Sequence, residues 1–365
     1  MSASVPGPAA PRTATPRVGV IGADVPRQLV LAAGATPVRI FGSWSQPYSS
    51  EAAELLGAVD AVAARILDEV LSGAHDDLAG LVVCNDSAAD LRIFYVLRIL
   101  SERGRVPFPV HLLDAPRDGG APRDRFVGRQ YDRLVAFCES LTGERIDAAG
   151  LRLAARRERE LGRALTALRA RRRARECSGA AALHAYVAAA TLPPEHAMAI
   201  VDDAASADAR DGEPVFVTGS AHPEASVYRV IEAAGLVVVG EDHDTADAAW
   251  IGDAVDTGDR DEAVGRLAQR HAARPPLAAR SRTRERAAEL ERRLAETDAS
   301  GVLALVRELD DGPVWDLPGQ RAVAERRGLP IASRARIAPE AALVEAEEVA
   351  SALAGELAAA GQVTR

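Results

Sequence analysis

Short apolar runs alternate with longer amphipathic stretches along the whole chain. The apolar runs are continuous rather than alternating, which is typical of strands in a parallel sheet that is covered on both faces. They fall into two groups, at 17–21, 36–41, 80–84 and 109–113, and then at 214–218, 236–240, 302–306 and 329–333. The stretches between them space their apolar residues as helices do. This alternation predicts an α/β fold with parallel sheets.

The two groups of strands carry the same order of turn signals. The first strand of each group is followed by a glycine, Gly22 or Gly219, and Ala-Ala-Gly precedes the second strand of each, ending at Gly34 or Gly235. A glycine at such a place takes the left-handed conformation that closes a helix before the next strand. We therefore predict two similar, Rossmann-like domains with parallel sheets.

A long region without strand signals separates the two groups. Residues 131–141 have helical spacing, Asp147 is a predicted N-cap for the next helix, and Pro193-Pro194 interrupts the region before a third helical segment. Residues 339–360 are rich in Ala and Glu and predict a last helix. The expected organisation is a disordered tail (1–16), a first α/β domain (17–120), a helical insert (121–211), a second α/β domain (212–337) and a C-terminal helix (338–365).

Composition and charge narrow the class of protein. Hydrophobic residues make up 48% of the chain but aromatics only 4%, so the core must consist mainly of Ala, Val and Leu. The net charge of −9 argues against nucleic acid as a partner, which requires clustered positive charge. No apolar run is long enough to span a membrane, and the N-terminus lacks the apolar core of a secretory signal. We expect a cytoplasmic protein.

The cysteines do not form a metal-binding pattern. Cys84, Cys138 and Cys177 lie far apart and no Cys-x-x-Cys pair exists, which excludes a zinc knuckle or a thioredoxin-like motif. All three are expected to be small buried hydrophobic residues, and no metal site is predicted.

Polar residues follow the predicted strands at the edge where α/β folds bind ligands. The candidates for substrate binding are Ser43, Trp44, Asn85, Gly219 and Ser220. The catalytic residues are unknown, with Asp86, Ser87 and His222 as candidates, because a carboxylate, a hydroxyl and an imidazole can move protons. The alternative is ordinary turn chemistry, since these residue types are common in strand–helix turns.

Two charged segments have two interpretations each. The run 241–244 (Glu-Asp-His-Asp) resembles a metal cluster, but the acidity continues beyond it, which favours a solvated acidic loop. The Arg-rich stretch 152–175 suits a ligand that carries phosphate groups, because the guanidinium group binds phosphate with two hydrogen bonds. A solvated helix face, with Glu158 and Glu160 as partners, is favoured instead.

Six stretches in order carry a resemblance to a known family. They are 25–42 (VPRQLVLAAGATPVRIFG), 78–99, 110–117 (VHLLDAPR), 141–172, 216–242 and 312–333. No single stretch is specific, but the ordered set resembles the cluster-binding component of the 2-hydroxyacyl-CoA dehydratase and benzoyl-CoA reductase family. The resemblance extends from about residue 17 to residue 337.

The resemblance implies a pair of related subunits, each with a 4Fe-4S cluster held by three cysteines. One subunit of such a pair binds the acyl-CoA thioester, and a separate ATP-driven activator supplies the electron. In this chain the places of the three family cysteines are occupied by Gly22, Ser87 and Leu309. None of these residues supplies a thiolate, so we expect no cofactor in this chain.

The expected function is that of a cluster-less, non-redox subunit. Such a subunit would bind an acyl-CoA-like small molecule, or complete a dimer with a paralogous subunit that bears the 4Fe-4S cluster, or with a second copy of itself. The first alternative is a repurposed, redox-independent enzyme that acts on an acyl-CoA or a related acid. The second alternative is a structural scaffold. If the chain is catalytic, the resemblance implies a lyase or a subunit of one.

Overall fold

The computed structural model describes residues 14–23, 25–117, 119–206, 211–250, 254–277 and 281–363. Most of the predicted tail, 1–16, therefore lies outside the described residues. The strands of the first domain are β1 (Arg17–Ile21), β2 (Thr36–Arg39), β3 (Gly80–Cys84) and β4 (Val110–Leu113), and those of the second are β5 (Glu213–Gly219), β6 (Leu236–Glu241), β7 (Gly301–Arg307) and β8 (Ile331–Ile337). All observed pairings are parallel.

The two sheets have the same topology. The strand orders are β2-β1-β3-β4 and β6-β5-β7-β8, so each sheet places its second strand at one edge and its third and fourth on the other side of the first. The prediction of two parallel α/β domains is thus confirmed. The strands continue past some of the predicted ends, most clearly β8, which runs on through the exposed Arg334 and Arg336 to the buried Ile337.

Helices cover both faces of each sheet. The first domain has α1 (Arg27–Ala32), α2 (Ser50–Leu56), α3 (Ala61–Leu71) and α4 (Ala88–Glu102). The region between the sheets forms α5 (Gly120–Thr142), α6 (Ala148–Arg173), α7 (Gly179–Thr191) and α8 (Pro194–Ala205). The second domain has α9 (Ser226–Ala233), the short 3-10 turn η1 (Asp247–Ala249), α11 (Thr283–Thr297), α12 (Asp311–Arg326), a second 3-10 turn η3 (Pro339–Ala341) and α13 (Ala342–Val363). Helix α10 (Arg260–Ala272) follows β6 in the chain but packs against α5 and the core of the first domain.

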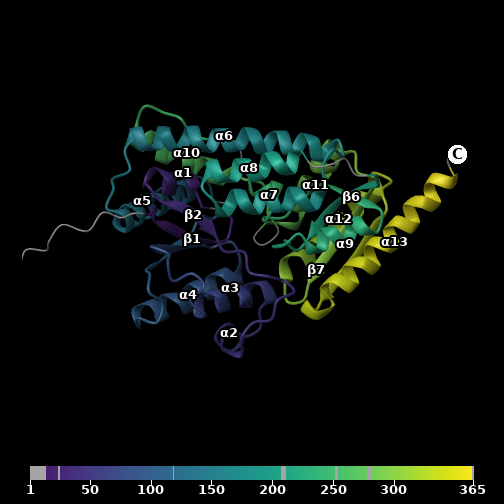
Figure 1. The fold of residues 1–365 in the computed structure, drawn as a ribbon, viewed down its shortest axis with the longest axis horizontal. Helices are drawn as coiled ribbons and strands as arrows, with labels where there is room; N and C mark the ends of the chain where they lie inside the picture. Colours follow the sequence, from purple (N-terminus) through teal and green to yellow (C-terminus); the bar gives the residue numbers. More distant parts are fainter. Residues whose placement is uncertain are drawn as a thin grey trace, which may run out of the picture.

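The long helix α6 connects the two halves. In Figure 1 it runs along one side of the molecule, from above the first sheet (purple and blue) to the second domain (green). It begins as predicted, since the Asp147 carboxylate accepts a hydrogen bond from the Gly150 backbone N–H at 2.7 Å. The predicted break at Pro193-Pro194 is confirmed as well, because α8 begins at Pro194. The predicted C-terminal helix is α13, which packs its buried residues against the second domain.

Apolar side chains fill the space on both faces of each sheet. Two core clusters flank the first sheet, and a large and a small one flank the second. Trp44, from the loop after β2, belongs to the large core of the second domain, so the two domains share a core. Cys84, Cys138 and Cys177 are free and buried, which confirms the expectation that they are small core residues.

No helix in the described part of the chain is long and apolar enough to cross a membrane.

Candidate functional site

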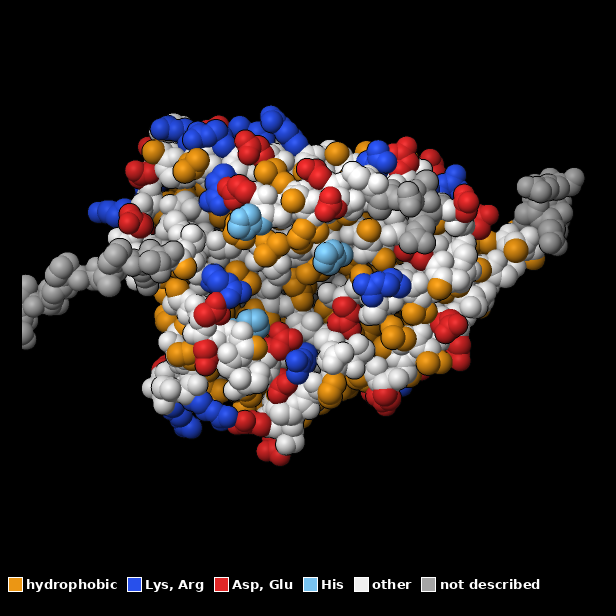
Figure 2. Space-filling view, in the orientation of Figure 1, with side chains coloured by type: hydrophobic (Ala, Val, Ile, Leu, Met, Phe, Trp, Pro, Cys, Tyr) orange, Lys and Arg blue, Asp and Glu red, His pale blue; other side chains and the backbone are white. Residues whose placement is uncertain are grey.

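A cavity of about 110 Å³ lies where the carboxyl ends of the two sheets face each other. Its walls come from the ends of β1, β2 and β3 in the first domain and of β5, β6 and β7 in the second. The lining includes Gly22, Phe41 and Ser87 from the first domain and Ala221, Asp244 and Arg307 from the second. This is the edge at which parallel α/β sheets bind ligands. In Figure 2, apolar side chains gather in the middle of the visible face, with charged groups of both signs around them.

Two arginines that line this cavity each form an ion pair with a carboxylate of the opposite domain. Arg39, at the end of β2, donates to the Asp244 carboxylate of the second domain at 3.0 Å. Arg307, at the end of β7, lies 3.3 Å from the Asp60 carboxylate of the first domain and 3.1 Å from Asp310. These side chains are largely buried, so each charge depends on its partner for stabilisation. The ion pairs hold the two domains together across the site.

Asp90 is a carboxyl group of this cavity whose pKa is strongly raised. It lies in the first turn of α4 and lines the cavity. Burial, together with the nearby carboxylates of Asp86, Asp244 and Asp60, raises the pKa of Asp90 to about 7. A carboxyl group with such a pKa exchanges a proton near neutral pH, which is the property of a general acid or base.

The turn after β3 holds three predicted site residues, and they point in different directions. Ser87 lines the cavity, and its hydroxyl accepts the backbone N–H of Asp90 at 2.9 Å, which caps α4. The Asp86 carboxylate turns back to accept the backbone N–H of Ala23 at 2.9 Å. The Asn85 amide donates to Asp114 at 2.8 Å. Of this turn, only Ser87 lines the cavity.

The predicted residues Ser43 and Trp44 form a contact between domains instead of lining the cavity. The hydroxyl of Ser43 donates to the Glu224 carboxylate of the second domain at 3.1 Å, and that of Ser45 does so at 3.0 Å. Trp44 is 1% exposed and packs against His222, with ring centroids 5.6 Å apart.

The turn after β5 positions Arg307. The hydroxyl of Ser220 accepts the backbone N–H of Arg307 at 3.0 Å. Gly219 has a φ of +105°, and a Cβ atom there would lie 2.3 Å from the backbone oxygen of Leu305, so only glycine fits. Gly219 and Ser220 thus fix the end of β7 without lining the cavity themselves.

The two neighbouring histidines differ in their access to the cavity. His222 is fully buried, neither ring nitrogen has a hydrogen-bond partner among the described residues, and burial keeps the pKa of this imidazole well below its usual value. His243 lines the cavity. Its Nε2 lies 2.8 Å from the Tyr228 hydroxyl and its Nδ1 lies 3.0 Å from the Thr245 hydroxyl, which fixes the ring. His243 therefore contacts the cavity with both ring nitrogens already hydrogen-bonded, while the predicted His222 does not line it.

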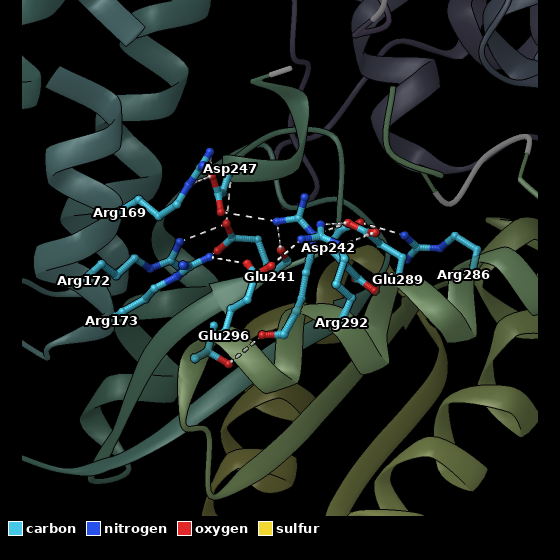
Figure 3. Close-up of polar contacts among 12 residues, drawn as sticks. Arg169, Arg172, Arg173, Glu241, Asp242, Asp247, Arg286, Glu289, Arg292 and Glu296 are labelled. Atoms are coloured by element: carbon cyan, nitrogen blue, oxygen red, sulfur yellow. Dashed lines mark hydrogen bonds and ion pairs between the residues drawn. The ribbon is translucent and has the colours of Figure 1, made fainter. Parts of the chain in front are cut away.

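The prediction of a solvated acidic loop at 241–244 is wrong. Glu241 and Asp242 are fully buried, and His243 is 1% exposed. The reason is that α6 and α11 cover the end of β6 and supply arginines, as Figure 3 shows. Arg172 pairs with Glu241 through both terminal nitrogens, and Arg286 lies 3.1 Å from Asp242. Burial opposes ionisation, but Arg172 outweighs it and lowers the pKa of Glu241 to about 2.

The Arg-rich helix is likewise only partly a solvated face. Arg172 is 1% exposed, and Arg169 pairs with Asp247 beneath the same strand end. The expected partner Glu158 is also buried and pairs with Arg27 of α1 at 3.3 Å. Ion pairs therefore connect α6 to the first domain through Glu158 and to the second through Arg169 and Arg172, while Arg163 remains exposed.

The charged residues that line the cavity were missed by sequence reasoning. They are Arg39, Asp60, Asp90, Arg307 and Asp310, with His243 and Asp244 assigned to a solvated loop. A signal existed for most of them, since Arg39 and Arg307 end strands, and Asp60 and Asp90 lie at the starts of the helices that follow β2 and β3.

Two parallel α/β domains with a cavity between their strand ends define a two-domain α/β protein. The family model that matches this chain is 2-hydroxyglutaryl-CoA dehydratase, D-component, over residues 23–332. The chain therefore belongs to that family. A search of curated proteins gave no match.

The residues at the three expected ligand positions do not fit a 4Fe-4S cluster. Gly22 has a φ of +92°, and a Cβ atom there would lie 2.6 Å from Asp86 Oδ2 and 2.7 Å from the Cβ of Cys84. Ser87 uses its hydroxyl as a helix cap, and the apolar side chain of Leu309 is 52% exposed. Within the described ranges, no group of three or more His, Cys, Asp or Glu side chains is arranged to hold a metal ion.

The chain's own cysteines are buried core residues and are not grouped as metal ligands among the described residues. Burial raises the pKa of the Cys138 thiol to about 12, and it raises that of Cys177 as well.

Proposed function

We propose that this chain is a cluster-less, non-redox member of its family that binds the acyl end of an acyl-CoA-like ligand in the interdomain cavity. The observation that carries the proposal is the crowding at Gly22. The Asp86 carboxylate accepts the Ala23 N–H beside it and takes the space that a side chain at position 22 would need. Polar groups therefore fill the place where the resemblance expects a thiolate.

The cavity itself supports a role in binding. It combines the apolar residues Ile40 and Ile66 with a hydroxyl, a fixed imidazole and two guanidinium groups, and such mixed linings are typical of small-molecule sites. Its volume of about 110 Å³ suits a short acyl group but not a whole coenzyme A, whose nucleotide would remain outside. A ligand carbonyl or hydroxyl oxygen would find its donors in Arg307 and Ser87.

The proposed partner is a paralogous subunit that bears the 4Fe-4S cluster, with a second copy of this chain as the other possibility. The family resemblance motivates this pairing, since two related subunits act together there. We propose that the pair acts in the cytoplasm and that the chain itself contributes binding rather than electron transfer.

A second candidate function is a redox-independent enzyme at the same cavity. The observation that favours it is Asp90, whose pKa of about 7 provides a proton donor or acceptor at the cavity wall near neutral pH. His243, whose two ring nitrogens are held by Tyr228 and Thr245, would be a fixed part of the same cavity wall.

Calorimetric titration with butyryl-CoA, using coenzyme A without an acyl group as the control, tests the proposal. The chain is measured alone and with a cysteine-complete homologue. Butyryl-CoA should bind more tightly than coenzyme A, and Ser87→Ala should weaken its binding about tenfold through loss of a hydrogen bond. The matched control is Ser140→Ala, which removes an exposed hydroxyl of α5 and should change nothing.

The outcomes separate the candidate functions. Binding without turnover by the chain alone supports the non-redox subunit. Turnover by the chain alone that is lost in Asp90→Asn supports the redox-independent enzyme. Equal affinity for butyryl-CoA and coenzyme A, or no binding of either, contradicts an acyl site and leaves the scaffold.

A further inference from the structure

A second, smaller cavity lies beside the interdomain cavity and shares Gly22, Arg39 and Thr245 with it. We call it the side slot. Its volume is about 60 Å³, and its walls are mostly apolar. They come from the first domain, from helices α6 and α7 and from the residues around η1, and they include Val25, Pro37, Leu165, Ala189 and Trp250.

Arg27, the first residue of α1, lines the side slot with unsatisfied hydrogen-bond donors. Its Nε donates to both oxygens of Glu158 at 3.3 Å. Both terminal nitrogens, Nη1 and Nη2, are buried and have no hydrogen-bond partner among the described residues. The Nε of Arg39, which also lines the slot, is likewise buried without a hydrogen-bond partner among the described residues. Buried N–H groups without an acceptor are strongly unfavourable, so these donors indicate a missing acceptor.

The lining of the side slot differs in charge from that of the neighbouring cavity. The residues that line the slot include Arg27 and Arg39, which pair with Glu158 and Asp244, and no carboxylate. The interdomain cavity is lined by four carboxylates, those of Asp60, Asp90, Asp244 and Asp310, against Arg39 and Arg307. A carboxylate would therefore meet unsatisfied N–H donors in the slot and like charges in the cavity.

We infer that the side slot binds an apolar monocarboxylate, whose carboxylate pairs with the terminal nitrogens of Arg27 and whose hydrocarbon part packs against Leu165 and Trp250. The guanidinium group presents parallel N–H bonds that match the two oxygens of a carboxylate. The apolar walls exclude a strongly hydrated anion such as phosphate, which has no hydrocarbon part to bury. This site does not rest on the proposed acyl site, since it uses different residues for charge and for packing.

The test is a titration of the full-length chain with hexanoate, with its neutral isostere hexanamide and with inorganic phosphate. Binding is followed by calorimetry and by the fluorescence of Trp250, whose ring lines the slot. Hexanoate should bind at least about tenfold more tightly than hexanamide, and phosphate should not bind. Arg27→Gln should weaken hexanoate binding at least about tenfold, and Arg27→Lys should weaken it less because it retains the charge but loses the second donor nitrogen.

A variant that fills the slot tests the site without touching the Arg27–Glu158 ion pair. Ala190→Leu, on α7, places a larger side chain in the lining and should abolish hexanoate binding. Ala181→Leu on the same helix lines a different surface groove and should leave binding unchanged. Thermal melting shows whether each variant folds. If Arg27→Gln does not fold, hexanoate binding by Ala190→Leu tests the site.

Three results would overturn the inference. They are equal affinities for hexanoate and hexanamide, hexanoate binding that persists in Ala190→Leu, and no binding of hexanoate in the millimolar range. Any of these could occur while butyryl-CoA still binds in the interdomain cavity, so failure here is distinguishable from failure of the proposed function.

Discussion

The turns after β3 and β6 lie at corresponding edges of two sheets, yet they do opposite things. After β3, the side chains of Asn85, Asp86 and Ser87 form hydrogen bonds with Asp114, Ala23 and Asp90, and Ser87 lines a cavity. After β6, Glu241 and Asp242 are fully buried beneath α6 and α11 and pair with arginines. The carboxyl end of a parallel strand thus becomes part of a site in one domain and a rigid support in the other. What differs is whether helices with arginines cover it.

The strongest way to break this comparison is to remove Arg172. Arg172→Met leaves the Glu241 carboxylate buried without its partner, and removing one member of a buried ion pair costs about 3–5 kcal/mol. Urea unfolding monitored by circular dichroism measures the loss. The matched control is Arg173→Met, whose ion pair with Glu296 is about one-third exposed and should contribute less than about 1 kcal/mol. Similar losses in the two variants would show that the strand end of β6 is not a rigid support.

A second change tests the crowding at Gly22. Gly22→Ala places a Cβ atom 2.6 Å from Asp86 Oδ2 at a φ of +92°, and such overpacking should cost about 3 kcal/mol. Gly34→Ala has a similar φ of +75° with nothing within 4 Å, and should cost only about 1 kcal/mol for the backbone. Equal losses in the two variants would mean that Asp86 moves aside easily, and position 22 would then have room for a side chain.

A third prediction concerns the dependence of stability on pH. The pKa of Asp90 is about 7 in the folded chain against 3.8 as the usual value. Between these pH values the unfolded chain has lost the proton while the folded chain keeps it, so stability falls as pH rises towards 7. Asp90→Asn cannot lose this proton, so its stability does not fall in this way. The free energy of unfolding of Asp90→Asn minus that of the unchanged protein should therefore rise by at least about 1 kcal/mol from pH 4 to pH 7.

Unfolding at a series of pH values gives the difference directly. A pH-independent difference between Asp90→Asn and the unchanged protein would contradict the raised pKa of this carboxyl group.

The smallest effect is expected at the contact between Ser43 and Glu224. Glu224→Gln keeps the shape but replaces the carboxylate that accepts from Ser43 and Ser45, which should cost about 1 kcal/mol. A loss above about 3 kcal/mol would mean that this loop, rather than the Arg39 and Arg307 ion pairs, holds the domains together. Urea unfolding of Glu224→Gln beside Arg39→Met makes the comparison.

The fold was predictable because strands covered on both faces, such as Gly80–Cys84, are continuously apolar and bounded by turn residues. The candidate site was predictable only in part. Ser87 and Gly22 line the cavity as the strand-end rule suggests. Ser43 and His222 do not, because their side chains are taken up by the contact with the other domain, which no local pattern records.

The charged residues also show that a local sequence pattern cannot predict contacts made in the tertiary structure. Glu241 and Asp242 belong to an acidic stretch that is typical of solvated loops, and only the arginines of α6 and α11 make their burial possible. Arg172 and Glu241 are far apart in sequence, so their pairing is a property of the tertiary structure.

The most direct test of the cluster-less account is the iron and acid-labile sulfide content of the chain after anaerobic purification and reconstitution, alone and with a cysteine-complete homologue. The account predicts no stoichiometric iron in this chain and iron only in the homologue. About four irons per chain, with the visible absorption of a 4Fe-4S cluster, would contradict it and make Cys84 the first thiol to examine.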